Sequence, residues 1–204
     1  LKRDPEELKI VTCHLGNGSS ISAVKGGKCI DTSMGFTPLA GVPMGTRSGD
    51  IDAAAVEFLC KKKGMDIHEA LTYLNKKCGM LGVSGVSSDY RDLTAAAKEG
   101  NYRAQLALNM FCYACKKYVG AYMAALGGLD VVVFTAGVGE NTPFIRHDVL
   151  SGLEAFGIEV DDEKNNFKND GAIHEISKDS SRVKVLVIPT NEELVIARET
   201  AALL

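Results

Sequence analysis

The chain has 204 residues and a mass of 21.8 kDa, a size typical of one large domain or two small ones. Hydrophobic residues make up 46% and charged residues 24% of it, which excludes disordered protein, collagen and coiled coil. The formal charge is −3 and no Lys/Arg run reaches five residues, which argues against a nucleic-acid-binding protein.

Three antiparallel strands are expected to open the chain. Lys9–Leu15 is rich in strand formers and ends at the turn Gly16-Asn17-Gly18. Ser20–Lys25 and Lys28–Ser33 flank the two-residue turn Gly26-Gly27. The long loop that follows, Met34 to Gly49, has little periodicity, and loops of that length are usually functional.

Helical patterns dominate the middle of the chain, and each begins at a capping residue or ends at a glycine. The expected helices are Ala53–Lys63, capped by Asp52 and ended by Gly64; one opened by the capping box Asp66-x-x-Glu69 and ended by Gly79; Asp89–Glu99, capped by Ser88; and Asn101–Leu126.

Strand–helix units are expected in the last third of the chain. The expected elements are a buried strand, Asp130–Ala136; a loop, Gly137–Asn141; a helix that is capped by Thr142, starts at Pro143 and ends near Gly157; a weak strand, Ile158–Val160; a strand, Val183–Ile188; and a final helix, Asn191–Leu203. This order predicts an α/β fold with a mixed sheet and flanking helices.

The cysteines predict no zinc site, because Cys112-x-x-Cys115 has no second pair at ligand spacing. That pair lies inside a helical pattern, so we expect packed, reduced thiols. The apolar stretches are too short to span a bilayer and no leader segment is visible, so we expect a cytoplasmic protein. The chain starts without Met, which suggests a piece of a longer protein.

Two glycine-rich loops have the composition of nucleotide-binding loops. In the first, His14 to Ser20, the Gly-x-Gly turn could wrap phosphate oxygens, with His14 and Asn17 donating hydrogen bonds; the alternative is a plain tight turn. In the other, Gly137-x-Gly139 is half of a dinucleotide fingerprint. Glu140 would repel a phosphate, so this loop indicates a nucleoside pocket.

Two further segments carry isolated charges. Arg47 stands among small residues, where a guanidinium suits phosphate recognition or transition-state neutralisation; the alternative is a bridge between loop carbonyls. Thr190-x-x-Glu193 fits a capping box, which leaves Glu192 for a hard cation such as Mg²⁺ or for the helix dipole. Residues 89–92 could be capping and a surface ion pair.

Together these loops resemble the acetokinase family, within the actin-like, sugar-kinase and Hsp70 ATPase superfamily of ribonuclease H-like folds. The matching segments are CHLGNGSS (13–20), TSMGFTPLAGVPMGTRSGDID (32–52), VSSDYRDL (86–93), VFTAGVGEN (133–141) and IPTNEEL (188–194).

The resemblance implies a role for each segment in a Mg²⁺-dependent transfer from ATP to acetate. Arg47 would stabilise the phosphoryl group in flight, Pro38 would line the pocket for the acyl methyl group, and Glu192 would help to hold Mg²⁺. The nucleotide contacts implied are His14, Leu15, Gly16, Asn17 and Gly18 on the phosphates; Asp89, Tyr90 and Arg91 on the nucleoside; and Gly137, Val138, Gly139, Glu140 and Asn141 on the adenosine.

The resemblance covers only the second of the family's two domains, so residues 1–204 are expected to form one domain, without the amino-terminal one. That domain supplies an Asn, an Arg, an Asp and a His to the family's site, so the isolated chain should be nearly inactive. Propionate or butyrate kinase is the alternative within enzymes. A non-catalytic nucleotide-binding and dimerisation module is the alternative outside them, since the family dimerises through this domain.

Overall fold

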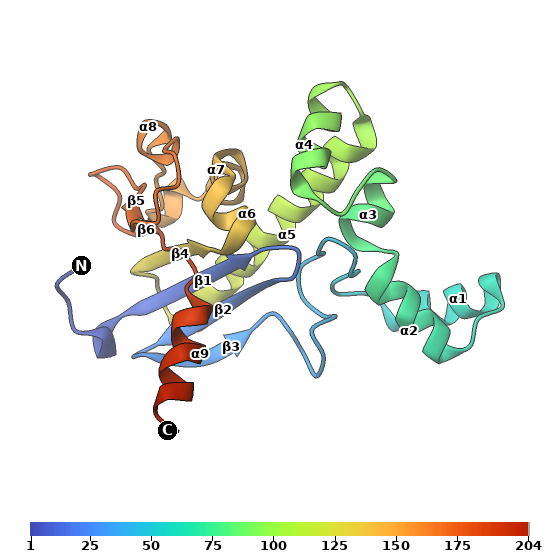
Figure 1. Cartoon of the computed structure of the whole chain (residues 1–204). Helices are drawn as coiled ribbons and strands as arrows, with labels where there is room; N and C mark the ends of the chain where they lie inside the picture. The colour runs from blue at the N-terminus through green and yellow to red at the C-terminus, as the bar shows by residue number, and fades with distance from the viewer. Residues whose placement is uncertain (204) are drawn as a thin grey trace.

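A six-stranded mixed sheet forms the centre of the computed structural model, which describes residues 1–203 (Figure 1). The strand order is β3-β2-β1-β4-β6-β5; β1 is antiparallel to β2 and parallel to β4, and β6 is parallel to β4. This confirms the predicted mixed sheet opened by three antiparallel strands, and its topology is ribonuclease H-like. The strands are β1 Lys9–Leu15, β2 Ser19–Lys25, β3 Lys28–Thr32, β4 Val131–Thr135, β5 His174–Glu175 and β6 Lys184–Val187.

The sheet follows from the pattern of apolar residues. In β1, Val11, Cys13 and Leu15 alternate with less buried residues, as in a strand with one face on the core. The central strand β4 is apolar almost throughout, which suits a strand with parallel neighbours on both sides. The long helix α5 covers this core with a buried stripe that includes Phe111, Cys115 and Val119.

Helices surround the sheet, and α1 to α4 lie beyond the carboxyl end of β1 (Figure 1). No helix among residues 1–203 is long and apolar enough to cross a membrane. The helices are α1 Ala53–Lys63, α2 Ile67–Lys76, α3 Gly79–Ser84, α4 Tyr90–Lys98, α5 Tyr102–Leu126, α6 Ala136–Asn141, α7 Pro143–Leu150, α8 Asp162–Asn165 and α9 Glu192–Ala201, with 3-10 turns at Pro5–Glu7 and Glu154–Phe156.

The predicted ends of the middle helices are partly confirmed. Asp52 caps α1, Gly64 ends it with φ +63°, and Asp66 and Glu69 form the expected capping box of α2. The prediction that Gly79 ends α2 was wrong, because α2 ends at Lys76 and Gly79 begins the short helix α3.

The predicted cap of α4 was also wrong. Asp89 is the capping residue rather than Ser88: its Oδ1 accepts a hydrogen bond from the Arg91 backbone N–H at 2.8 Å. Asp and Ser are about equally good capping residues, and Asp89 takes the role because α4 begins one residue later than predicted, at Tyr90.

Three predictions in the last third were wrong. Residues 137–141 form the helix α6 instead of a loop, and the helix that starts at Pro143 ends at Leu150, well before Gly157. Thr142 precedes Pro143 as predicted, but its side chain makes no capping hydrogen bond. Residues 158–160 form no strand beyond a single bridge at Val160.

The capping box predicted for the last helix is replaced by a different contact. Asn191 caps α9 by accepting from the Leu194 N–H at 3.2 Å, and α9 ends at Ala201. The Thr190 hydroxyl instead accepts from the Ala136 N–H at 3.0 Å, which ties this segment to the start of α6. This long-range bond is what the local sequence pattern could not show.

The paired cysteines are packed thiols, as predicted. Cys112 and Cys115 are free and buried on α5. Burial raises the pKa of the Cys112 thiol to about 12 and that of Cys115 well above its ordinary value.

Candidate functional site

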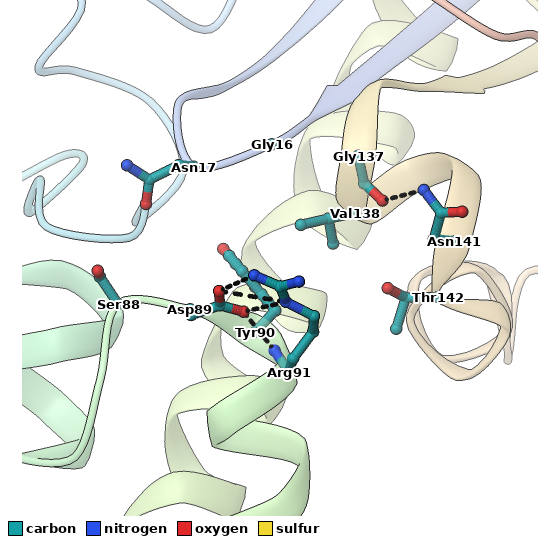
Figure 2. Close-up of a pocket in the computed structure, with 10 residues that line it drawn as sticks. All are labelled: Gly16, Asn17, Ser88, Asp89, Tyr90, Arg91, Gly137, Val138, Asn141 and Thr142. Carbon is teal, nitrogen blue, oxygen red and sulfur yellow. Dashed lines mark hydrogen bonds and ion pairs between the residues drawn. The ribbon is translucent and has the colours of Figure 1, made fainter.

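Three segments far apart in the sequence line one cavity of about 690 Å³ at the carboxyl ends of β1 and β4. Ligands of open α/β sheets bind at this edge. Figure 2 shows the lining residues: Gly16 and Asn17 after β1; Ser88, Asp89, Tyr90 and Arg91 at the start of α4; and Gly137, Val138, Asn141 and Thr142 on α6 and just beyond it. The structure thus brings together residues of the first loop, the α4 start and the 137–141 segment.

The first loop is a closed turn at the mouth of the cavity. The Gly16 N–H donates to the Gly18 carbonyl at 3.1 Å, and the Ser19 hydroxyl donates to the Gly16 carbonyl at 3.0 Å. Asn17 reaches across to the next loop, where the Gly45 N–H donates to its carbonyl at 3.0 Å. A Cβ on Gly45 would overlap the Asn17 side-chain oxygen, so glycine at this position makes the close approach possible.

Arg47 lies against this first loop. A Cβ on Gly18 would stand only 3.3 Å from Arg47 Nη1, and the same nitrogen donates to the Pro38 carbonyl at 3.3 Å. The guanidinium is half-buried and its charge faces no carboxylate among the ion pairs of residues 1–203. Arg47 therefore bridges to a loop carbonyl, as in the second alternative above, and also keeps its positive charge beside the first loop.

Glycine 79 supports the turn that carries Arg47. The Met44 N–H donates to the Arg47 carbonyl at 3.0 Å, and the Met80 N–H donates to the Met44 carbonyl at 2.8 Å. Gly79 has φ +57°, and a Cβ there would overlap the Met44 and Arg47 carbonyls. The backbone of α3 thus packs directly on the Arg47 turn.

Asp89 and Arg91 form an ion pair on the cavity wall. The Arg91 Nη2 donates to Asp89 Oδ2 at 2.6 Å, and these side-chain bonds, with the Arg91 backbone N–H, lower the pKa of Asp89 to about 2. The capping and ion-pair reading of this segment is confirmed, and the pair still faces the cavity (Figure 2).

The Tyr90 side chain is buried, unlike the side chains of Asp89 and Arg91. It is 5% exposed and packs edge-on against Phe111, with ring centroids 5.0 Å apart. Burial raises the pKa of its hydroxyl well above the ordinary value. Leu15 is likewise fully buried. The Leu15 side chain therefore belongs to the core, and the Tyr90 ring packs into the core while Tyr90 still forms part of the cavity wall.

The segment 137–141 presents a backbone surface to the cavity. Asn141 Nδ2 donates to the Gly137 carbonyl at 2.9 Å, while Gly139 is buried, and a Cβ placed on it would lie 3.6 Å from Phe134 in β4. Glu140 uses both carboxylate oxygens inside the protein: Oε1 accepts from the Thr190 N–H at 2.8 Å and Oε2 from Asn169 at 3.2 Å. Its carboxylate thus joins α6 to the segment before α9.

Arg146 is a supporting residue that the sequence analysis missed. It is fully buried in α7, and its Nη1 donates to the Gly139 and Glu140 carbonyls at 2.8 Å each. Its other nitrogens donate to Asn165 at 2.7 Å, and its guanidinium lies 5.0 Å from the Phe167 ring centre. Burial lowers its pKa to about 10, so it stays charged at neutral pH.

A signal for this arginine does exist in the sequence. Arg146 stands three residues before Val149 and four before Leu150, so it falls on the apolar face of its helix. A charged residue on such a face is buried only when it is paired or hydrogen-bonded. Here it satisfies the carbonyls at the end of α6, which would otherwise have no donor.

Glu192 borders a second cavity, of about 360 Å³, next to the first loop. The lining residues are His14, Ala136, Gly137, Glu140, Thr190, Asn191, Glu192 and Glu193. His14 and Gly137 connect this cavity to the loops that border the larger one. The structure therefore places Glu192 and His14 around one cavity, although nearly 180 residues separate them.

The donor set around Glu192 fits Mg²⁺ that is bound with a nucleotide. Residues 1–203 contain no cluster of three or more His, Cys, Asp or Glu side chains that would form a complete protein cage. Mg²⁺ usually takes one or two carboxylates, and its other ligands are phosphate oxygens and water. The exposed carboxylate of Glu192, open to a cavity beside the glycine loop, meets this requirement.

Comparison with known proteins shows which family has this arrangement. The sequence profile of the acetokinase family matches residues 1–198. The chain belongs to the acetokinase family. It is 59% identical over 204 residues to the acetate kinase of Caldicellulosiruptor saccharolyticus and 56% identical over 203 residues to that of Treponema denticola; each alignment covers 100% of this chain and 51% of the relative.

Solved structures show the same fold. The acetate kinase of Porphyromonas gingivalis matches with a TM-score of 0.92 and 49% identity, over 97% of this chain and 49% of that one. A propionate kinase from Francisella tularensis matches with a TM-score of 0.87 and 41% identity, over 95% of this chain and 49% of that one. This acetokinase chain therefore spans about half the length of the relatives it matches.

Proposed function

We propose that this chain is the nucleotide-binding, carboxy-terminal part of an acetate kinase, an enzyme that transfers the γ-phosphoryl group of ATP to the carboxylate of acetate. The observation that carries the proposal is the convergence of the first loop, the α4 start and α6 around one cavity, with Arg47 against the first loop. The 59% identity to an acetate kinase supports the choice of reaction.

In this proposal the cavity of about 690 Å³ holds the nucleoside between the start of α4 and α6. Asp89 and Arg91 form one wall, and the α6 backbone from Gly137 to Asn141 forms the other. The phosphates extend to the turn of residues 14–18, where glycines let backbone N–H groups approach an anion. Glu140 and Arg146 act as positioning residues for α6, since their side chains bond to protein groups.

Arg47 is proposed to stabilise the phosphoryl group during transfer, because a guanidinium matches the equatorial oxygens of that group. Glu192 is the residue that would hold Mg²⁺, which when bound supplies charge neutralisation between the phosphates. Pro38, whose carbonyl accepts from Arg47, would border the acyl site. The groups of the family's other domain complete the site, so we propose that the isolated chain has little activity of its own.

Propionate is the second candidate substrate. The observation that favours it is the 41% identity and TM-score of 0.87 to a propionate kinase. Of the residues implied for the acyl pocket only Pro38 belongs to this chain, and a single residue does not set the acyl length.

We also propose that the protein is cytoplasmic and that two copies of it form a homodimer. Helix α1 buries none of its residues, and Phe58, Ile67 and Leu71 of the α1–α2 hairpin are exposed apolar residues. Such a patch suits the homodimer contact that the family makes through this domain. A non-catalytic nucleotide-binding and dimerisation module would share this surface, but would have no need of Arg47 beside the first loop.

The direct test joins this chain to the half of the Caldicellulosiruptor acetate kinase that it does not match. We expect this hybrid to release ADP from MgATP only when acetate is present, with acetate preferred over propionate in kcat/KM. The chain alone, at equal concentration, should release at least 100-fold less, because groups that act together on one phosphoryl group lose most of their effect when some are missing. A folded hybrid that binds nucleotide but shows no acyl-dependent turnover would refute the proposal.

A further inference from the structure

The loop that carries Arg47 is closed at its base by one carboxylate. Asp50 Oδ1 accepts from the Gly41 N–H at 2.8 Å, and the Asp50 N–H donates to the Gly41 carbonyl at 2.8 Å. Gly49 packs tightly inside this closure: it has φ +72°, and a Cβ there would lie 2.6 Å from the Gly41 carbonyl oxygen. Residues 41–50 therefore form a ring whose geometry depends on where the Asp50 side chain is held.

Helix α5 holds that side chain. The Tyr118 hydroxyl donates to Asp50 Oδ2 at 2.6 Å, a short bond of the kind formed with a charged acceptor. The Tyr118 ring is fixed in turn against Tyr122, with ring centroids 5.6 Å apart. Burial and the neighbouring Asp50 carboxylate raise the pKa of Tyr118, so the phenol keeps its proton throughout the neutral range.

The same helix also supports the nucleotide cavity. Phe111 packs on Tyr90 at the cavity wall and stands seven residues before Tyr118, about two helical turns. Seven residues place the two side chains on one side of α5. One rigid helix thus contacts both the wall of the nucleotide cavity and the base of the Arg47 loop.

We propose that Tyr118 is a positioning residue, whose bond to Asp50 fixes the Arg47 loop relative to the nucleotide cavity. The inference deepens the proposed function and rests on it for the role of Arg47. Tyr118 does not contact a reacting group. It acts through Asp50, Gly41 and the ring that they close.

The first test uses this chain alone, without any ligand. Amide hydrogen exchange, followed residue by residue by NMR, is compared between the unmodified chain and Tyr118→Phe. We expect the Gly41 and Asp50 amides to exchange about 10-fold faster in the variant, since a hydrogen bond to a charged group typically contributes this much or more. The amides of Val11 and Cys13 in β1 should keep their rates.

Tyr113→Phe is the matched control. Tyr113 stands on α5 beside the same loop and is 64% exposed, and among residues 1–203 its hydroxyl forms no hydrogen bond to the loop. Loss of the Tyr113 hydroxyl should leave the amide exchange rates of Gly41 and Asp50 unchanged. Equal exchange rates in Tyr118→Phe and the unmodified chain would overturn the proposal.

The second test separates positioning from general stability, using the hybrid enzyme described above. We expect Tyr118→Phe to lower kcat about 10-fold with the KM for MgATP within about twofold, because Arg47 is misplaced while the nucleotide site is intact. A raised KM with unchanged kcat would contradict the positioning role. If the unmodified hybrid is inactive, the proposed function fails, and exchange at Gly41 and Asp50 still decides whether Tyr118 holds the loop.

Discussion

Arg47→Ala should lower the acetate-dependent kcat of the hybrid enzyme by about 10³-fold, with the dissociation constant for MgADP changed less than about threefold. The reason is that a guanidinium placed on a transferring phosphoryl group acts mainly in the transition state, where it is worth about 10³-fold or more. Arg47 lies beside Gly18 of the first loop rather than in the larger cavity, so it contributes little to holding the nucleoside. Steady-state kinetics and calorimetry measure the two quantities separately.

Two further variants make this prediction specific. Arg182→Ala removes an exposed arginine that lines neither cavity and whose Nη2 donates to the Phe156 carbonyl. This variant should keep kcat within about twofold of the unmodified hybrid. Arg47→Lys keeps the charge but not the planar fork, and should recover only a small part of the loss. A lysine variant as active as the unmodified enzyme would show that a point charge suffices, against the proposed role.

Gly79→Ala should destabilise the protein far more than Gly64→Ala, although both glycines have nearly the same left-handed backbone, with φ +57° and +63°. A Cβ on Gly64 meets no atom within 4 Å, so we expect only the backbone cost of about 1 kcal/mol. A Cβ on Gly79 overlaps the Met44 and Arg47 carbonyls, which adds about 2 kcal/mol or more through a forced backbone shift.

Urea unfolding of the two variants measures this difference in the free energy of unfolding. Because the overlap falls on the Arg47 turn, Gly79→Ala should also lose phosphoryl transfer in the hybrid under conditions in which it is still folded. Equal losses of stability in the two variants would mean that the contact between α3 and the Arg47 turn yields without cost. The close packing of α3 on the Arg47 turn would then be wrong.

The features that could be predicted from the sequence are those that depend on local sequence pattern. The alternation in Lys9–Leu15, the glycines after β1 and the Asp66–Glu69 capping box all specify their structure through neighbours along the chain. The order of strands and helices therefore predicted the mixed sheet, and the glycine loops identified two of the three segments that line the larger cavity. These segments meet because parallel strands end at one edge, a property of topology that the strand order already implies.

The remaining features depend on contacts between distant residues. Thr190 matches a helix cap locally, yet its hydroxyl bonds to Ala136, and Asn191 becomes the cap. Residues 137–141 appear as a glycine loop, but the buried Arg146 donates to the carbonyls at the end of this segment and a helix forms. A local pattern can place such side chains on a helix face, but it cannot identify their hydrogen-bond partners, as with Tyr118 and Asp50, because the partners are distant in the sequence.

The most direct measurement of the central claim is a calorimetric titration of MgADP into this chain and into its Glu192→Gln variant. We predict one site with a dissociation constant on the order of micromolar to millimolar. Glu192→Gln should weaken MgADP binding about 5-fold or more but leave metal-free ADP unchanged, and Glu193→Gln, a neighbour in the same cavity, should alter neither. Absence of binding at millimolar MgADP, in the chain and in the hybrid alike, would contradict the assignment of this cavity as a nucleotide site.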